Sequence, residues 1–495
     1  MFHSPRIRRG DGRPYRWEYV DGVPLQSLRA PTFNELPEEL LAQVFQLLVD
    51  DPVPPKDEED PDDSFIRVAP TLIVQQVSRA WRAAALHAPR VWCYIDLDFT
   101  AFSALPNRSR AYLRTLLTRS GAVPLHVRLY NYLPPKDPGR RVPDEAAEEF
   151  LQAYDWLGCE AALDALVRQA YRWKTFELQC CHLDSHEARR ALLGRIHVSA
   201  PLLEEFSLQL HGDAHTGFES KHAGTAPLLP YAPRLRAVNL DHNFLAYVHF
   251  AGLNGLSSIT LGGAGYIVHD LSYALATCMS LKRLRLDSSV PMDFGAYAPR
   301  HPRADTPSTT RAVVLPALTD LELMNGQLQV LFPLADKLFL PAIQNVTVGP
   351  MYSTQNPEAQ FAFLKTVCAR LRRIHVSLTD PFHQPFSLSD IVKAFPDVEE
   401  VIAENWTVDA RDFQELLRQG VGEQLTRLTM PDCHFSLLGG VAGVVVNFLG
   451  VRNADDQRWG PPLILDLPRQ LTIPESVHTE LDRCKTPTPQ RSTQK

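Results

Sequence analysis

The stretch LPALTDLEL, residues 315–323, sets a proline before leucines that are spaced three and then two positions apart. The same template, Pro-x-ϕ-x-x-ϕ-x-ϕ with ϕ apolar, recurs at 200–208, 232–240, 340–348 and 395–403. Without the proline it recurs at 173–178, 256–261, 281–286, 371–376 and 425–430. A motif that returns every 21 to 37 residues is typical of a stacked repeat array. The middle ϕ residues are Phe176, Phe206, Val238, Ile259, Leu284, Leu321, Val346, Ile374, Val401 and Leu428.

The repeated unit predicts a chain of the α/β class. Its last two apolar positions alternate with polar ones, as in a strand with one buried face, and the rest of each unit leaves room for a helix and loops. Parallel strands from successive units would form a sheet on one face of a curved solenoid. We expect each proline at the first residue of its strand, because proline cannot donate to the sheet ladder.

Before the repeats, residues 33–48 (FNELPEELLAQVFQLL) predict a helix. Pro37 suits its first turn, where the missing N–H costs nothing, and Glu38 and Glu39 suit the positive end of the helix dipole. The apolar residues cover more than the stripe of about 100° that a surface helix needs. We therefore expect this helix to bury one side inside the chain and another side against a partner.

Residues 77–92 (VSRAWRAAALHAPRVW) predict a further short helix. Ser78 is its expected N-cap, and Pro89 is expected to end it. We expect Trp92, Ile95 and Leu97 to begin the first strand of the array.

Polar segments predict the domain boundaries. The 495 residues are too many for one compact core. Residues 1–30 predict a disordered basic tail, residues 475–495 a second disordered tail, and residues 50–63 (DDPVPPKDEEDPDD) a solvated acidic insertion. A helical module at 31–95 and a repeat domain at 96–474 remain.

Composition disfavours several classes of function. A net charge of −7 does not favour nucleic acid as a partner. The chain has no run of eighteen apolar residues, so we expect no membrane span. Eight scattered cysteines fit reduced thiols in the cytoplasm or nucleus.

Motifs that carry chemistry are incomplete. The stretch CCHLDSH at 180–186 lacks the second ligand pair of a zinc site, and LGGAG at 261–265 lacks the remaining residues of a phosphate-binding loop. We therefore expect no metal, no cofactor and no catalytic residue. A hydrolase whose site is assembled from distant repeats stays open as a weaker alternative.

The segment 33–97 resembles an F-box. Its residues 36–48 match the family's L-P-x-E start, and residues 77–85 and 89–92 match the closing V-C/S-R/K-x-W-R-x-x-A and P-x-ϕ-W patterns. The acidic insertion departs from the usual short linker and is similar to insertions in expanded fungal F-box proteins. The repeats resemble degenerate leucine-rich repeats, in which Cys181, Asn243 and Cys433 take the family's buried Asn or Cys position and seven copies lack it. The alternative for 33–97 is a helical cap over the open end of the array.

The resemblance implies a function. F-boxes are three-helix modules that dock on the Skp adaptor of cullin–RING ubiquitin ligases, while the C-terminal domain captures a substrate protein and catalyses nothing itself. A repeat scaffold independent of ubiquitin is the alternative. The adaptor-binding residues implied are Leu36, Pro37, Leu40, Leu41, Val44, Phe45, Leu48, Val77 and Trp81.

The strand face is the expected substrate surface. Ten parallel strands would span roughly 45 Å, enough for a protein or an extended peptide. Charges of alternating sign along it predict a protein ligand of mixed charge. The candidate residues are Glu204, Arg236, Arg283, Arg285, Glu322, Arg373 and Glu400.

Overall fold

The computed structural model describes most of the repeats and part of the N-terminal helical module. The described residues are 19–20, 23–24, 36–50, 76–98, 106–130, 160–181, 186–211, 228–241, 255–262, 268–287, 312–324, 331, 334, 336–351, 357–368, 370–378, 387–419, 422–435, 441–453 and 463–466. The acidic insertion from residue 51 onward, Asn243 and the expected C-terminal tail lie outside them.

The chain divides into two compact units. The first comprises Met1–Asp96, Ala111–Val123 and Pro134–Arg140, and the second comprises Leu97–Arg110, Pro124–Leu133 and Arg141–Lys495. In the first unit, the helices α1 (Glu38–Asp50) and α3 (Arg79–His87) pack on each other and on the 3-10 helix η2 (Pro89–Trp92).

A large parallel sheet of thirteen strands dominates the fold, so the expected α/β class is confirmed. Its strands follow one another in the order of the chain, and each is paired with the next. They are β3 (Tyr94–Asp98), β4 (Leu125–Tyr130), β5 (Trp173–Cys181), β6 (Glu205–His211), β7 (Ala237–Asp241), β8 (Ser258–Gly262), β9 (Arg283–Leu286), β11 (Asp320–Met324), β13 (Asn345–Met351), β14 (Arg373–Leu378), β15 (Glu400–Glu404), β17 (Arg427–Thr429) and β19 (Ile464–Asp466).

The ten middle apolar residues of the sequence template form one continuous row across this sheet. Each is the register partner of the next, from Phe176 beside Phe206 to Val401 beside Leu428. All ten are at most 4% exposed. The row extends by one residue at each end, to Val127 and Leu465. Its burial supplies much of the apolar area that holds neighbouring units together.

The template prolines do not begin the strands, which corrects the expectation from sequence. Pro316 lies four residues before β11, inside a turn in which the Leu318 amide donates to the Leu315 carbonyl. The same bond forms around Pro201, where Leu203 donates to Ala200. Proline favours the second position of such a turn because its φ is already near −65°. The turn, rather than the strand, is therefore what selects the proline.

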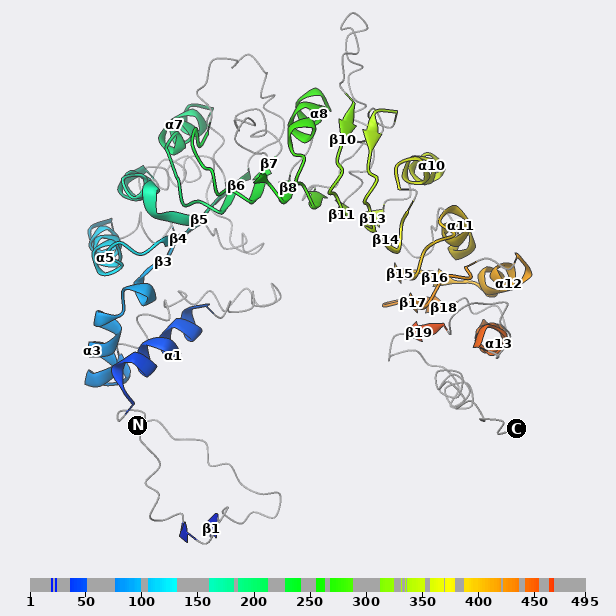
Figure 1. Ribbon diagram of the computed structural model, residues 1–495, viewed down its shortest axis with the longest axis horizontal. Helices are drawn as coiled ribbons and strands as arrows, with labels where there is room; N and C mark the ends of the chain where they lie inside the picture. Colours follow the sequence, from blue (N-terminus) through cyan, green and yellow to red (C-terminus); the bar gives the residue numbers. More distant parts are fainter. Residues whose placement is uncertain are drawn as a thin grey trace, which may run out of the picture. The chain divides into compact units, whose positions relative to one another are not determined.

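Helices alternate with the strands in the second unit and lie along one side of them (Figure 1). They cover the side toward which the buried apolar row points. The 3-10 helix η3 (Ala170–Arg172) leads directly into β5. The helices are α7 (His186–Ile196), α8 (Val268–Thr277), α10 (Pro357–Val367), α11 (Leu388–Ala394), α12 (Ala410–Gln419) and α13 (Val441–Asn453), and α5 (Pro106–Arg119) lies between β3 and β4 in the chain.

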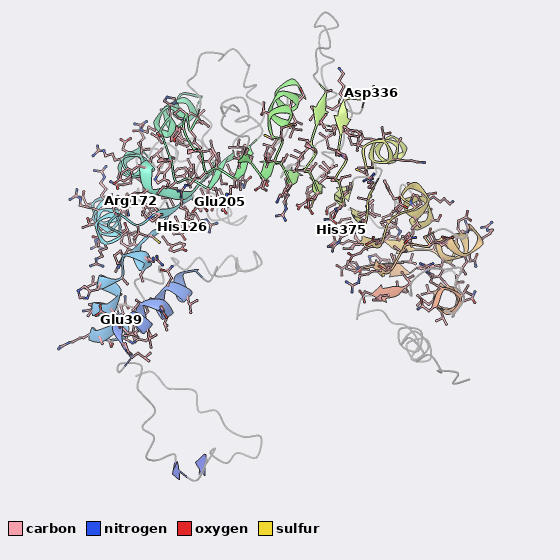
Figure 2. The ribbon with its side chains drawn as sticks, viewed as in Figure 1. Glu39, His126, Arg172, Glu205, Asp336 and His375 are labelled. Atoms are coloured by element: carbon pink, nitrogen blue, oxygen red, sulfur yellow. The ribbon has the colours of Figure 1, made fainter. Side chains whose placement is uncertain are left out.

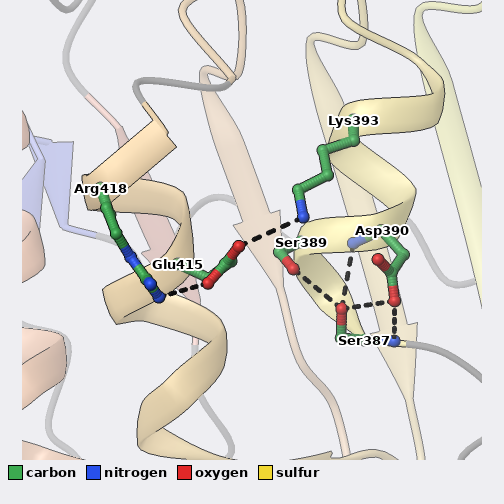
Figure 3. A network of polar contacts seen from close by, with 6 residues as sticks. All are labelled: Ser387, Ser389, Asp390, Lys393, Glu415 and Arg418. Carbon is green, nitrogen blue, oxygen red and sulfur yellow. Dashed lines mark hydrogen bonds and ion pairs between the residues drawn. The ribbon is translucent and has the colours of Figure 1, made fainter.

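Polar contacts fix where α11 begins and join it to α12 (Figure 3). The Ser387 hydroxyl accepts from the Asp390 amide at 3.1 Å, and the Asp390 carboxylate accepts from the Ser387 amide at 2.9 Å. This reciprocal pair is a capping box and satisfies two of the helix's free donors. Lys393 of α11 then reaches Glu415 of α12 at 3.4 Å, and Glu415 also pairs with Arg418.

Three small two-stranded sheets accompany the main one. β10 (Val313–Val314) pairs with β12 (Leu338–Phe339), and β16 (Thr407–Val408) pairs with β18 (His434–Phe435), both in parallel. Within the expected N-terminal tail, β1 (Tyr19–Val20) pairs antiparallel with β2 (Val23–Pro24). No helix in the described residues is long and apolar enough to cross a membrane.

Candidate interaction surfaces

The helix α1 carries two apolar stripes, as its sequence predicts. Leu41 and Phe45, one turn apart, are 2% and 0% exposed. Phe45 packs against Trp81 of α3 with ring centroids 5.1 Å apart. These three residues belong to the implied adaptor site, and the structure gives them a packing role inside the first unit.

The second stripe of α1 faces solvent. Leu40 and Leu47 are 45% and 70% exposed, and their spacing of seven positions places both on one side of the helix. Val77, directly before the α3 cap, is 56% exposed. Exposed side chains of this size are costly in water, so Leu40 and Leu47 form a candidate contact surface.

The other implied adaptor residues lie around these stripes. Leu36 and Val44 are half-buried, and Pro37 is exposed. Pro37 directly precedes α1, and its carbonyl accepts from the amides of Leu40 and Leu41, so it caps the helix rather than occupying its first turn. Leu48 lies in α1, but its side chain is outside the described residues.

The closing part of the module follows its sequence in the cap of α3 but not in the place of Trp92, which lies in η2 (Pro89–Trp92) and not at the start of β3 (Tyr94–Asp98). Ser78 is the N-cap of α3 and accepts from the Trp81 amide at 3.1 Å. Trp92 is fully buried, and its indole N–H donates to the Ala85 carbonyl at 2.6 Å. The Arg119 guanidinium lies 4.3 Å from the Trp92 ring centroid. Trp92 therefore holds the end of α3 against η2.

The face of the main sheet away from the helices carries the polar residues of the template. His126, Glu205 and His375 mark this face in Figure 2. Residues alternate between the two faces of a strand, so the positions flanking the buried row point here. We call this surface the sheet face.

Several charges on the sheet face pair across neighbouring strands. Arg128 lies 3.3 Å from Glu177, and Arg373 lies 3.1 Å from Glu400. The pairs Arg285–Glu322 and Arg427–Asp466 continue the pattern, and the His375 ring forms a hydrogen bond with Glu404 at 3.1 Å. The alternating signs seen in the sequence are thus largely neutralised within the protein, since consecutive template copies become adjacent strands.

Arg285 is the most constrained of these cations. It contacts Asp287 at 2.7 Å and Glu322 at 3.3 Å. The hydrogen bond to Asp287, followed by the attraction of both carboxylates, raises the pKa of Arg285 above its ordinary value despite partial burial.

We expect Arg285→Glu to lower the free energy of unfolding by about 1 kcal/mol, because it breaks two half-exposed pairs and adds a third carboxylate beside them. Arg283→Glu, two residues away and without an ion pair among the described residues, should change it by less than about 0.5 kcal/mol. Urea unfolding followed by circular dichroism measures both. Equal losses for the two variants would contradict the pairing.

Three implied substrate residues keep their charges free. Glu204, Arg236 and Arg283 form no ion pair among the residues that the structure describes. The implied substrate residues therefore divide into two sets. Arg285, Glu322, Arg373 and Glu400 pair with one another, while Glu204, Arg236 and Arg283 are available to a ligand.

No family model matches this chain, and no curated protein matches it.

Within the described part of the chain, no group of three or more His, Cys, Asp or Glu side chains could hold a metal ion. The side chains of the 180–186 motif lie outside that part. Burial raises the pKa of Cys278 to about 11, and of Cys368 and Cys433 to about 12. These thiols stay protonated near neutral pH and are poor nucleophiles.

Proposed function

We propose that this protein is the substrate-recognition subunit of a cullin–RING ubiquitin ligase. Its first unit would be an F-box that binds the Skp adaptor, and its second unit a leucine-rich-repeat solenoid that binds a substrate protein. The protein itself would contribute no catalytic residue.

The observation that carries this proposal is the second apolar stripe of α1. A helix that only closed one end of a repeat array would need a single buried stripe. Here Leu41 and Phe45 already serve the core, yet Leu40 and Leu47 remain exposed on the other side. An apolar surface that the fold does not use favours a partner protein. The F-box resemblance of the same residues supports the adaptor as that partner.

The sheet supports the second half of the proposal. Its strands pair only in chain order, and the template residues form one buried row, as stacked leucine-rich repeats would. The sheet face is polar and carries both signs of charge, which fits a protein ligand better than a nucleic acid, whose groove would be basic throughout.

We expect Leu40→Asp and Leu47→Asp each to weaken adaptor binding more than tenfold, because each buries an uncompensated carboxylate at the interface. Both side chains are exposed, so the unfolding free energy should change little. A pull-down of the full chain with purified Skp adaptor measures binding, and circular dichroism checks the fold.

Phe339→Asp is the matched control. Phe339 is 62% exposed on β12 in the second unit, and its replacement should leave adaptor binding unchanged. Unimpaired binding by both α1 variants would remove the F-box proposal. A chain that never binds the adaptor would favour the ubiquitin-independent scaffold.

A further inference from the structure

One section of the sheet face differs from the rest in having no ion pair among its described residues. Two side-chain rows cross it. At the positions in register with Arg285, strands β6–β8 carry Ser207, Asn239 and Thr260. The row in register with Arg283 holds Ala237 and Ser258 on β7 and β8. This section, which we call the neutral section, therefore lies between the Arg128–Glu177 pair and the Arg285–Glu322 pair.

An unpaired charge stands on each side of the neutral section. Glu205 begins β6 and Arg283 begins β9, and both are exposed without an ion pair among the described residues. Asp320 is the register neighbour of Arg283. Its carboxylate instead accepts from Asn345 at 2.7 Å and from the hydroxyl of Thr319. These bonds hold the Asp320 carboxylate, which stays charged, and it forms no ion pair with Arg283 among the described residues.

Two polar atoms inside the neutral section also lack partners. The Ser207 hydroxyl oxygen and the Asn239 side-chain oxygen are buried without a hydrogen bond from any described residue. They belong to register-paired residues on adjacent strands. Both atoms are covered by the protein's own atoms, so a ligand would contact the outer atoms of these two side chains.

We propose that the neutral section binds an extended segment of a protein, with a basic residue at Glu205 and an acidic residue at Arg283. Three strand spacings separate these charges, or about 14 Å. An extended chain covers that distance in about four residues. The small side chains of Ala237 and Ser258 leave room for the main chain between the two charges. The inference rests on the proposed function for the expectation that the ligand is a protein.

Neighbouring charges reinforce the two ends. Glu204 precedes Glu205, and Lys282 precedes Arg283, so each end carries two charges of one sign. Arg236 lies beside Glu204, since its amide donates to the Glu204 carbonyl at 2.8 Å.

The test uses the full chain and four synthetic nine-residue peptides with Ser, Thr and Val spacers. The first peptide carries Arg and Glu four positions apart, and the second carries Arg and Glu at adjacent positions. The third carries two Glu four positions apart, and the fourth carries two Arg four positions apart. Fluorescence anisotropy measures the dissociation constants. Wild type should bind the first peptide about fivefold more tightly than each of the others, since each mismatch loses one partly exposed charge pair.

Single reversals should then change the preference in a defined way. Glu205→Arg makes both ends basic, so the peptide with two Glu should become the best ligand. Arg283→Glu makes both ends acidic, so the peptide with two Arg should become the best. Arg168→Glu is the matched control, because Arg168 is exposed outside the strands, and it should keep the wild-type order.

The same peptide order in all four proteins, or no binding of any peptide, would overturn the inference. Adaptor binding by the Leu40 and Leu47 variants tests the first unit and does not depend on these peptides. If the reversals change the peptide preference but the chain does not bind the adaptor, the neutral section remains the proposed ligand site and the proposed ligase role is wrong. If the chain binds the adaptor but the reversals do not change the peptide preference, the proposed ligase role remains and the neutral section is not the ligand site.

Discussion

Replacing Trp92 by Ala should lower the stability of the first unit by about 3–5 kcal/mol, the usual cost of removing a buried aromatic side chain. Trp92 is fully buried, donates to the Ala85 carbonyl and lies under the Arg119 guanidinium. Hydrogen exchange read by mass spectrometry can follow α3 separately from the sheet. We expect the α3 amides to exchange at least a hundredfold faster, and adaptor binding to fall with them.

The control for this experiment is Trp92→Phe. Phenylalanine keeps most of the buried area and loses the indole donor, which should cost about 1 kcal/mol. The Ala85 carbonyl keeps one partner, the Ala88 amide at 3.3 Å. If the two variants accelerated exchange equally, the packing of Trp92 would not be what holds α3.

Asp412→Asn should stabilise the protein at pH 7.5, by up to about 3 kcal/mol. Asp412 lies in the first turn of α12 and is 6% exposed. Burial raises the pKa of its carboxyl to about 6, with Asp409 and Asp390 adding repulsion and backbone bonds from Asp409 and Leu388 opposing the shift. A neutral amide keeps the acceptor oxygen and removes the cost of the buried charge.

The pH dependence gives the sign of this effect. Because the folded protein holds this proton more tightly than the unfolded chain, the contribution of Asp412 to stability is fully present below about pH 4. It falls as the pH rises from about 4 to 6 and is constant above that. Urea unfolding across this range should show wild type losing stability relative to Asp412→Asn, and a constant difference between them would contradict the raised pKa.

Asp390→Asn is the contrasting variant. Its carboxylate is exposed and accepts from both the amide and the hydroxyl of Ser387. Neutralising it weakens the capping box, so we expect a loss of about 0.5–1 kcal/mol at pH 7.5. The two aspartates should therefore change stability in opposite directions.

The strands that sequence could predict are those whose template is complete. Two strands of the sheet were missed, β4 and β19, and the reason is the same in both. Their middle residues, Val127 and Leu465, have a proline three positions earlier, Pro124 and Pro462, where the template needs an apolar residue. The alternation of Leu125, Val127 and Leu129 was the remaining signal for β4.

Side-chain pairing was only partly readable from the sequence. Arg285 and Glu322 occupy the same template position in consecutive copies, so their contact could have been inferred from adjacent strands. The hydrogen bonds from Thr319 and Asn345 to the Asp320 carboxylate could not be inferred from the sequence, because several acceptors compete for the same donors. For α1, helical spacing separates Leu41 and Phe45 from Leu40 and Leu47, but only the position of α3 decides which stripe is buried.

The order of strands in the main sheet has a mechanical consequence. Every strand is bonded only to the strands before and after it in the chain. A pulling force applied to the two ends of the chain would therefore break the hydrogen bonds of the outermost strands first. The strands would then detach one at a time. An optical trap would record a staircase of small extensions, each releasing one segment of 21 to 49 residues, in place of a single large rupture.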